Sequence, residues 1–165
     1  MSRGTTGVAL RSHSFERAAP DPDNDDLIVQ TALRLEFVDL NRLLAERVRA
    51  LGLRDGVLYL QTRHTTTGLV LNENEPLLLG DLQRTLERLV PERSDYAHDD
   101  IERRGMPKDE PRNAAAHCRA LLLPASQCLI VRSGELQLGR WQSLFLVELD
   151  GPRRRSIALA AIESR

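Results

Sequence analysis

Apolar and polar residues alternate along much of the chain after residue 26, and three stretches show helical spacing instead. Alternation with a period of two predicts strands, because successive side chains of a strand face opposite sides of a sheet. Apolar residues three or four positions apart predict helices. The predicted elements are a strand at 27–37, a helix at 40–51, strands at 56–63 and 68–72, a helix from Pro76 to the break at Pro91, a helix at 114–123, and strands at 127–131, 135–138, 141–149 and 154–162.

Caps and turns delimit these elements. Asp39 and Asn113 stand where helix N-caps are expected, and Ser133-Gly134 and Asp150-Gly151 have the composition of tight turns. Residues 92–113 are polar and contain two prolines, so they predict a long loop of the kind that often carries function. Strands and helices are therefore mixed in the first part of the chain, and antiparallel hairpins come last.

Composition narrows the class of protein. The 165 residues carry a net charge of −1, from 23 basic and 24 acidic side chains, so no global field attracts nucleic acid or an anionic membrane. No stretch approaches the roughly 20 apolar residues of a membrane span. Cys118 and Cys128 form no paired framework, which favours a reducing cytoplasm. We expect a cytoplasmic protein with small-molecule or protein partners, a flexible N-terminal extension at 1–26 and one domain at 27–165.

Three histidines are candidates for a metal site. His64 continues the inward face of a strand, His98 lies in the long loop, and His117 lies on a helix face with apolar residues. Three imidazoles are the ligand set of a metal that keeps one position open for water or substrate. Isolated histidines are also common as packed or surface residues, and no His-x-x-x-His pair is present, so both interpretations stay open.

Other polar residues have two interpretations as well. Glu73 and Asp81 suit a general base or a cation site, and equally helix capping. The run 153–155 is all arginine, which suits phosphate binding or a solvated strand edge. Trp141 and Gln142 suit a pocket wall, although a core position is common for tryptophan. The chain contains no P-loop, dinucleotide fingerprint or Ser-His-Asp signature, so we predict no nucleotide or organic cofactor.

Taken together, the motifs resemble the YjbQ-like family, often labelled secondary thiamine-phosphate synthase. The resemblance covers residues from about 27 to the C-terminus. The motifs that carry it are His64-Thr65-Thr66, Asn72-Glu73-Asn74, Asp81-Leu82, Tyr96-x-His98, Asn113-x-x-Ala116-His117, Gly139-Arg140-Trp141-Gln142 and Glu148-x-Asp150-Gly151-Pro152-Arg153.

The resemblance implies a small α+β domain with largely antiparallel, β-sandwich-like sheets and about three helices, assembled as a homotrimer. It implies a reaction that joins a pyrimidine diphosphate to a thiazole phosphate and releases pyrophosphate, with a divalent ion, Zn²⁺ or Mg²⁺. By motif position the imidazoles that bind the metal or an anion are His64, His98 and His117. The catalytic group is Asn72, Glu73 and Asp81, and the residues for a phosphorylated substrate are Thr65, Thr66, Arg140, Trp141, Gln142 and Arg153.

Two observations leave alternatives to that reaction. Many relatives carry a second histidine where this chain has Ala115, so one imidazole is absent. The main thiamine-phosphate synthases resemble TIM barrels, which need more than about 200 residues, so the activity cannot follow from shared architecture. The alternatives are a non-catalytic trimeric protein that binds a metabolite or anion, and a metal-dependent hydrolase.

Overall fold

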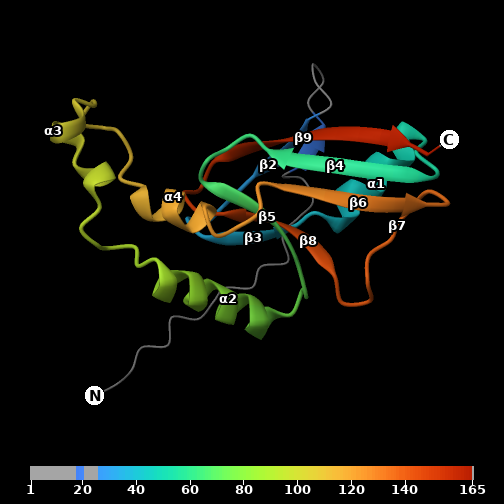
Figure 1. Ribbon diagram of the computed structural model, residues 1–165, viewed down its shortest axis with the longest axis horizontal. Helices are drawn as coiled ribbons and strands as arrows, with labels where there is room; N and C mark the ends of the chain where they lie inside the picture. Colours follow the sequence, from blue (N-terminus) through green and yellow to red (C-terminus); the bar gives the residue numbers. More distant parts are fainter. Residues whose placement is uncertain (1–17, 21–25, 165) are drawn as a thin grey trace.

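A computed structural model describes residues 18–20 and 26–164 and shows two antiparallel sheets with helices beside them (Figure 1). The α+β class predicted from the sequence is confirmed. The larger sheet has the strand order β1-β2-β9-β4-β6-β7 and the smaller one the order β3-β8-β5. The larger sheet consists of β1 (Ala18–Pro20), β2 (Leu27–Gln30), β4 (Gly56–Thr62), β6 (Ser126–Arg132), β7 (Glu135–Leu136) and β9 (Arg154–Glu163), and the smaller sheet of β3 (Glu36–Asp39), β5 (Thr67–Asn72) and β8 (Ser143–Glu148).

The central strand of the smaller sheet is buried on both faces. Leu144 and Leu146 of β8 pack into the cluster between the two sheets, together with Leu58 and Leu60 of β4. Phe145 of the same strand faces the opposite side, toward a second cluster. A run that is apolar on both faces predicts a central strand or a subunit contact, and the structure shows the central position.

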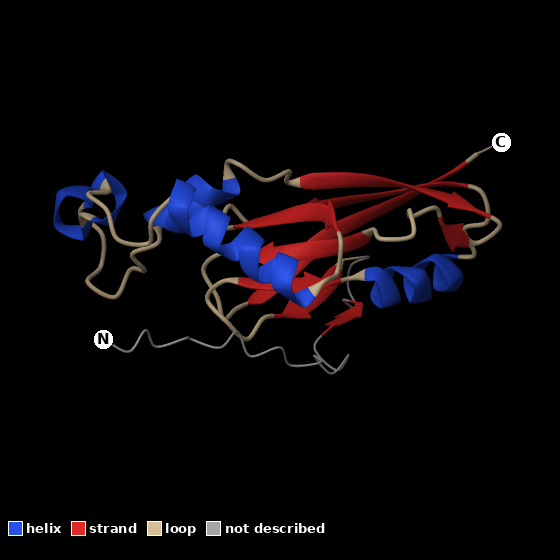
Figure 2. Ribbon diagram, turned by 90° about the horizontal axis from the view of Figure 1, so that it is seen from below, coloured by secondary structure: helices blue, strands red, loops and turns tan. Residues whose placement is uncertain are grey.

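Helices cover the second face of the smaller sheet. Leu86 of α2 (Pro76–Leu89) and Ala116 of α4 (Ala114–Ala120) pack against Phe145, and Figure 2 shows a long helix lying across the strands. At the other side, Leu44 and Val48 of α1 (Asn41–Leu51) complete the cluster between the sheets. The smaller sheet is thus the middle layer between α2 with α4 and the larger sheet.

One short helix lies inside the segment that the sequence predicts as loop. Residues 92–113 form an arm that extends away from the sheets and holds the single turn η2 (Ala97–Asp99) and α3 (Ile101–Arg104) (Figure 1). The carboxylate of Asp100 accepts from the Arg103 amide at 3.0 Å, and Gly105 ends the helix with a left-handed conformation. These caps stabilise α3, which is too short to show a hydrophobic period in the sequence. The described residues therefore hold one more α-helix than predicted.

Two further boundaries differ from the prediction. The strand predicted at 27–37 is two strands in different sheets, because the Glu36 carboxylate accepts from the amides of Ala32 and Leu33 and closes a turn between them. The helix predicted at 114–123 ends at Ala120. Within the predicted extension at 1–26, β1 pairs with β2, and most of the other residues lie outside the described part. No helix among residues 18–20 and 26–164 is long and apolar enough to cross a membrane.

Candidate active site: a pocket at the base of the arm

A polar pocket of about 290 Å³ opens where the arm meets the smaller sheet. The β4–β5 turn, the end of the arm, α4 and the start of β9 each contribute to it. The register of β5 and β8 explains the location, because Thr67 at the start of β5 pairs with Glu148 at the end of β8. The lining residues are Thr65, Thr66, Glu110, Pro111, Asn113, His117, Asp150, Arg153 and Arg155.

A buried ion pair forms the floor of this pocket. Arg155 is 4% exposed and Glu148 is fully buried. The guanidinium donates from Nε to Glu148 Oε2 at 2.6 Å and from Nη2 to Glu148 Oε1, and Nη2 also donates to Thr66 Oγ1 at 3.0 Å. Glu148 accepts from Thr31 Oγ1 at 2.9 Å as well. Such a bidentate pair fixes the orientation of the arginine.

A second carboxylate, Asp150, connects the arm to the sheet. Its Oδ2 accepts from Arg153 Nη2 at 2.9 Å and from Asn113 Nδ2 at 2.9 Å. Arg34 approaches the other oxygen at 3.6 Å, and its Nε donates to Glu92 at the start of the arm at 2.7 Å. The prediction that the Asn113 side chain caps α4 is wrong, because that side chain is used in this contact. The cap comes instead from the arm, where Asp99 accepts from the Ala114 amide at 3.0 Å.

A close backbone contact requires glycine between Asp150 and Arg153. A Cβ atom on Gly151 would lie 2.3 Å from the Leu33 carbonyl oxygen, and real contacts are never that short. The peptide bond from Gly151 to Pro152 is cis. The Asp-Gly-Pro-Arg motif therefore turns the chain tightly against the β2–β3 connection and keeps both ionic side chains at the pocket.

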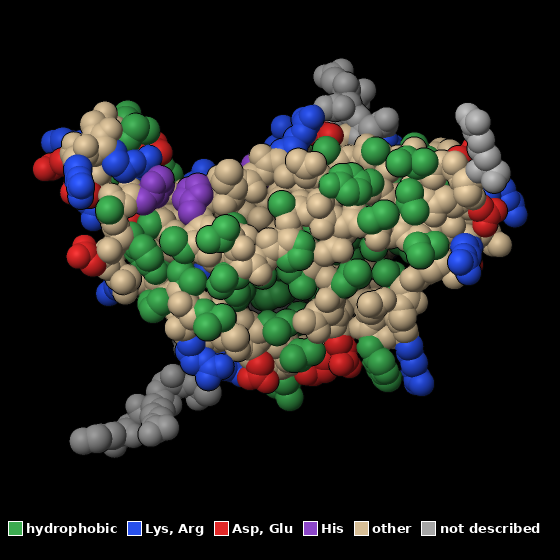
Figure 3. All heavy atoms as spheres, in the orientation of Figure 1, with side chains coloured by type: hydrophobic (Ala, Val, Ile, Leu, Met, Phe, Trp, Pro, Cys, Tyr) green, Lys and Arg blue, Asp and Glu red, His purple; other side chains and the backbone are tan. Residues whose placement is uncertain are grey.

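Two of the three predicted histidines lie together. The ring centroids of His98 and His117 are 5.0 Å apart with a near-perpendicular orientation, and Figure 3 shows two neighbouring histidine side chains at the base of the arm. Partial burial, then the neighbouring His98, lowers the pKa of His117 below its ordinary value of 6.5. His117 therefore presents a neutral imidazole to the pocket at neutral pH.

His64 has different neighbours. Its Nε2 accepts from the Ser156 amide of β9 at 2.8 Å, and the side chain is not part of the pocket lining. Burial, and next the charge of Arg155, lower the pKa of His64. The predicted set of three histidines is thus divided. Among residues 26–164 no group of three His, Cys, Asp or Glu side chains is arranged to hold a metal ion.

The described residues therefore do not supply the three protein ligands that are usual at a catalytic zinc site. The pair of His98 and His117 offers two imidazoles. The nearest carboxylates have hydrogen-bond partners already, since Asp99 caps α4 and Asp150 binds Arg153.

The predicted catalytic group lies at the other end of β5. Asn72 ends that strand opposite Ser143 and accepts from the Glu73 amide with its own side chain at 2.9 Å. Asp81 is exposed on α2 and pairs with Arg84 of the same helix. Glu73 is half-buried, and none of the three lines the pocket. The residue that caps α2 is Glu75, near Glu73 in the chain, because its carboxylate accepts from the amides of Leu77 and Leu78.

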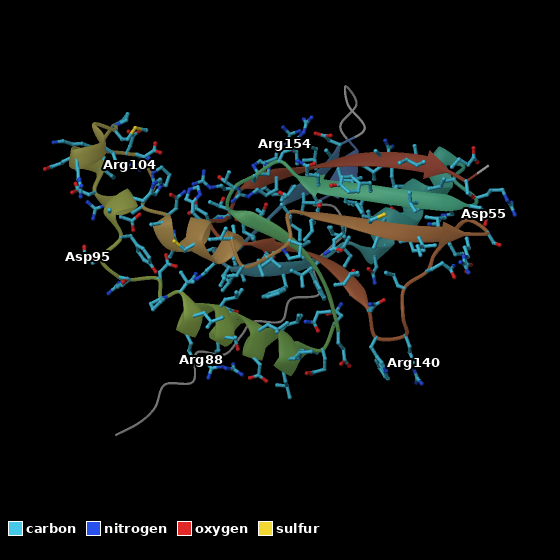
Figure 4. The ribbon with its side chains drawn as sticks, in the orientation of Figure 1. Asp55, Arg88, Asp95, Arg104, Arg140 and Arg154 are labelled. Carbon is cyan, nitrogen blue, oxygen red and sulfur yellow. The ribbon has the colours of Figure 1, made fainter. Side chains whose placement is uncertain are left out.

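Part of the predicted substrate group is also distant from the pocket. Trp141 is 62% exposed, not in the core, and Arg140 stacks on its ring at 4.7 Å. Figure 4 shows Arg140 on the β7–β8 connection, on the opposite side of the molecule from Arg104 in the arm. Gln142 closes the same loop by accepting from the Gly139 amide at 2.8 Å. Only Thr65, Thr66 and Arg153 of the predicted substrate group line the pocket.

Sequence reasoning misses Arg155, a buried member of the site. Arg155 belongs to an arginine run for which a solvated edge is the simpler interpretation, and its neighbour Arg154 is indeed exposed. Alternation along β9 turns Arg155 inward, toward Glu148. The signal is present in the sequence, because an inward arginine on a strand requires a carboxylate on a neighbouring strand.

Comparison with known proteins agrees with this architecture. The family described as UPF0047 protein YjbQ-like matches residues 25–164. A UPF0047 protein of Methanothermobacter thermautotrophicus is 38% identical over 82% of this chain and 88% of its own length. The UPF0047 protein YugU of Bacillus subtilis is 31% identical over 79% of this chain and 92% of its own.

Solved structures give the same result. A YbjQ-like protein of Sulfolobus solfataricus superposes with a TM-score of 0.75 at 33% identity, covering 85% of this chain and 96% of that one. A YjbQ/UPF0047 family protein of Clostridium acetobutylicum gives a TM-score of 0.72 at 31% identity, over 83% and 98%. The chain therefore belongs to the YjbQ-like UPF0047 family.

Proposed function

We propose that the pocket binds the phosphate group of a small metabolite, with Arg155 as the principal donor. The observation that carries the proposal is one unused hydrogen-bond donor. Nε and Nη2 of Arg155 are fixed by Glu148 and Thr66, whereas Nη1 has no hydrogen-bond partner among the described residues. A guanidinium held in this way presents the hydrogens of Nη1 to an anion, at little cost in side-chain entropy.

The surroundings suit a singly phosphorylated ligand better than a large one. Arg153 reaches the same pocket and is held by Asp150, so both cations are positioned before the ligand arrives. The volume of about 290 Å³ stands at the lower end of the range for small-molecule sites. Thr65 adds an exposed hydroxyl beside the two guanidinium groups.

His117 is the group best suited to move a proton in this pocket. Its lowered pKa makes the imidazole neutral near pH 7, as a general base must be before it accepts a proton. The thiamine-phosphate synthase-type coupling that the family resemblance implies is the first reaction to assay, although the attack itself requires no general base. In that reaction a thiazole nitrogen attacks the pyrimidine methylene carbon, the carbon–oxygen bond breaks, and pyrophosphate leaves with the electron pair toward the arginines.

A bound divalent ion would add Lewis-acid stabilisation of the leaving pyrophosphate. Zinc or magnesium stays a prediction, with His98 and His117 as the available imidazoles. The described residues of the chain do not complete a ligand set for such an ion.

A second candidate is a non-catalytic phosphate or metabolite binder. Glu73 and Asp81, the predicted catalytic carboxylates, lie outside the pocket, and the pocket volume leaves little room for two substrates at once. A hydrolase needs only one substrate, so it also fits the volume. Product analysis with one and with two substrates separates these possibilities.

We also propose that the chain assembles as a homotrimer in the cytoplasm. The outer face of the larger sheet supports assembly, because the register aligns Ile130, Val57 and Ile162 in one row across three strands, and Figure 3 shows apolar side chains over this face. Ile130 and Ile162 are 50% and 62% exposed.

The free thiols of Cys118 and Cys128 support a reducing compartment.

Calorimetric titration with inorganic phosphate and with pyrophosphate tests the binding proposal. Arg155→Lys keeps the charge beside Glu148 but removes the free Nη1 donor, so we expect phosphate affinity to fall about tenfold. Arg154→Lys on the exposed face of the same strand is the matched control and should bind as the wild type does. Unfolding midpoints verify that both variants are folded. Equal affinity of Arg155→Lys and the wild type, or no binding by the wild type at millimolar phosphate, would contradict the proposal.

A further inference from the structure

The antiparallel ladder between β4 and β9 ends in an unusual way. The last paired residues are Thr62 and Ile157. At the next position the Arg63 amide donates to the Ser156 carbonyl at 3.2 Å, which is half of an antiparallel hydrogen-bonded pair. The other half would be a bond from the Ser156 amide to the Arg63 carbonyl. Instead the Ser156 amide donates to Nε2 of His64 at 2.8 Å.

The imidazole therefore takes the place of a backbone carbonyl. Because its acceptor satisfies the Ser156 amide, the chain can leave β4 after Arg63 without a buried unpaired donor on β9. The Ser156 hydroxyl also lies 3.3 Å from the same nitrogen. His64 thus determines where the ladder stops and where the β4–β5 turn begins.

The hydroxyl wall of the pocket lies immediately beyond this turn. Thr65 and Thr66 come directly after His64, and Thr66 accepts from Arg155 at 3.0 Å with its hydroxyl. The Thr66 carbonyl accepts from the Leu149 amide at 3.2 Å. Arg155 itself is adjacent to Ser156 along β9. The imidazole bond is therefore one of the contacts that join the segment carrying Thr66 to the strand carrying Arg155, together with the Arg63 amide and the Thr66 hydroxyl.

We propose that His64 is a positioning residue for the phosphate site: its Nε2 accepts from the Ser156 amide and so holds Thr66 and the Arg155 guanidinium in register. It does not touch the ligand and does not bind a metal through Nε2. The expected effect on phosphate binding rests on the proposed function, whereas the hydrogen bond of His64 does not depend on it. Since the amide donates, the neutral ring carries its proton on Nδ1. The position of His64 at the end of the ladder, between two strands, agrees with a ring that stays neutral.

The substitution series follows from the reach of the side chain. Glutamine places its Oε1 about where Nε2 of histidine lies and can accept from the Ser156 amide. Leucine fills similar space and cannot accept. We therefore expect His64→Leu to lower phosphate affinity about fivefold to tenfold, and His64→Gln to stay within about twofold of the wild type. Unfolding midpoints for each variant establish that the folded protein is titrated.

Nitrogen NMR of the full-length wild type distinguishes this positioning role from a general packing role, because it reports which ring nitrogen of His64 is protonated. The expected spectrum has His64 Nε2 unprotonated and Nδ1 protonated near pH 7, unchanged when Zn²⁺ is added. A protonated Nε2, or an Nε2 resonance that moves on adding Zn²⁺, overturns the inference. The same spectra should show the Thr66 amide and the Arg155 Nε–H shifted in His64→Leu and nearly unshifted in His64→Gln; the absence of a shift in His64→Leu also overturns it.

These readouts separate the two proposals. If the wild type binds no phosphate but the nitrogen spectrum and the Arg155 shifts are as expected, the phosphate proposal fails and the positioning of Arg155 by His64 stands. If the wild type binds phosphate and His64→Leu binds equally well, the phosphate proposal stands and the positioning role fails.

Discussion

Neutralising Glu148 is expected to remove a large part of the stability of this domain. The carboxylate is fully buried and accepts from Arg155, from Thr31 and from the amides of Leu149 and Asp150 at 2.9 and 2.8 Å. Glutamine has nearly the same shape. Its NH₂ group would face donors in place of one oxygen, and Arg155 would stay buried without a counter-charge.

The magnitude follows from these contacts. Breaking a buried ion pair by removing one partner costs roughly 3–5 kcal/mol, because an uncompensated charge remains. Domains have free energies of unfolding of about 5–15 kcal/mol, so Glu148→Gln should be folded but much weakened. The exposed pair of Arg42 and Glu46 on α1 has an N–O distance of 2.9 Å and side chains that are 59% and 50% exposed. Its variant Glu46→Gln should cost below about 0.5 kcal/mol.

Urea denaturation at one fixed protein concentration measures these differences, since assembly would make the midpoint depend on concentration. The double variant Glu148→Gln with Arg155→Met removes both charges and keeps an acceptor for Thr31 and the two amides, so we expect it to be more stable than Glu148→Gln alone. A loss of less than about 1 kcal/mol in Glu148→Gln, or a double variant as unstable as the single one, would refute the reasoning.

Three further outcomes are expected. Burial holds the pKa of His64 below 6.5, so the contribution of the neutral ring to stability is complete above that pH and is lost as the pH falls through the lowered value. The urea midpoint should therefore fall less between about pH 7.5 and about pH 5 in His64→Gln than in the wild type. Equal falls in the two proteins would contradict this. Asp150→Asn leaves Arg153 without its carboxylate partner, so phosphate affinity measured by calorimetry should change at least about threefold, whereas an unchanged affinity would exclude a positioning role for Asp150. Ile130→Asp puts a charge on the apolar outer row, and sedimentation should show a monomer in place of a trimer of the 18.6 kDa chain; a trimer in the variant would exclude this face as the contact.

The sequence predicts most of the sheet correctly because local signals determine it. Leu58 and Leu60 are buried while Tyr59 is exposed, as alternation in β4 requires, and Ser133 with Gly134 adopts the two positive φ angles of a tight hairpin. The turn after β2 escapes prediction because it depends on the Glu36 carboxylate reaching back to two amides. Nothing in the hydrophobic period reports such a contact.

The candidate site is harder to predict because it depends on contacts between distant segments. Arg155 and Glu148 are close in sequence, but Asn113 and Asp150 are joined only because the arm returns to the sheet. Alternation predicts an inward side for His64, which is half-buried and lies two residues past the end of β4. Its function as an acceptor cannot be derived from the sequence, because the partner is a backbone amide of a strand some ninety residues later in the chain.

The stretch from His64 to Asn74 shows why nearness in sequence misleads about a site. Its two polar clusters bracket β5, which has six residues and so spans about 20 Å. The clusters therefore lie at opposite ends of one strand and cannot line one pocket within the chain. The start of β5 joins the pocket through Thr66 and Arg155. The far end is occupied by structural contacts, since Asn74 donates to Asp39 at 2.7 Å. Strand pairing, which sets Thr67 against Glu148, decides which polar residues meet, and it places the candidate pocket at the end of the sheet where the arm returns.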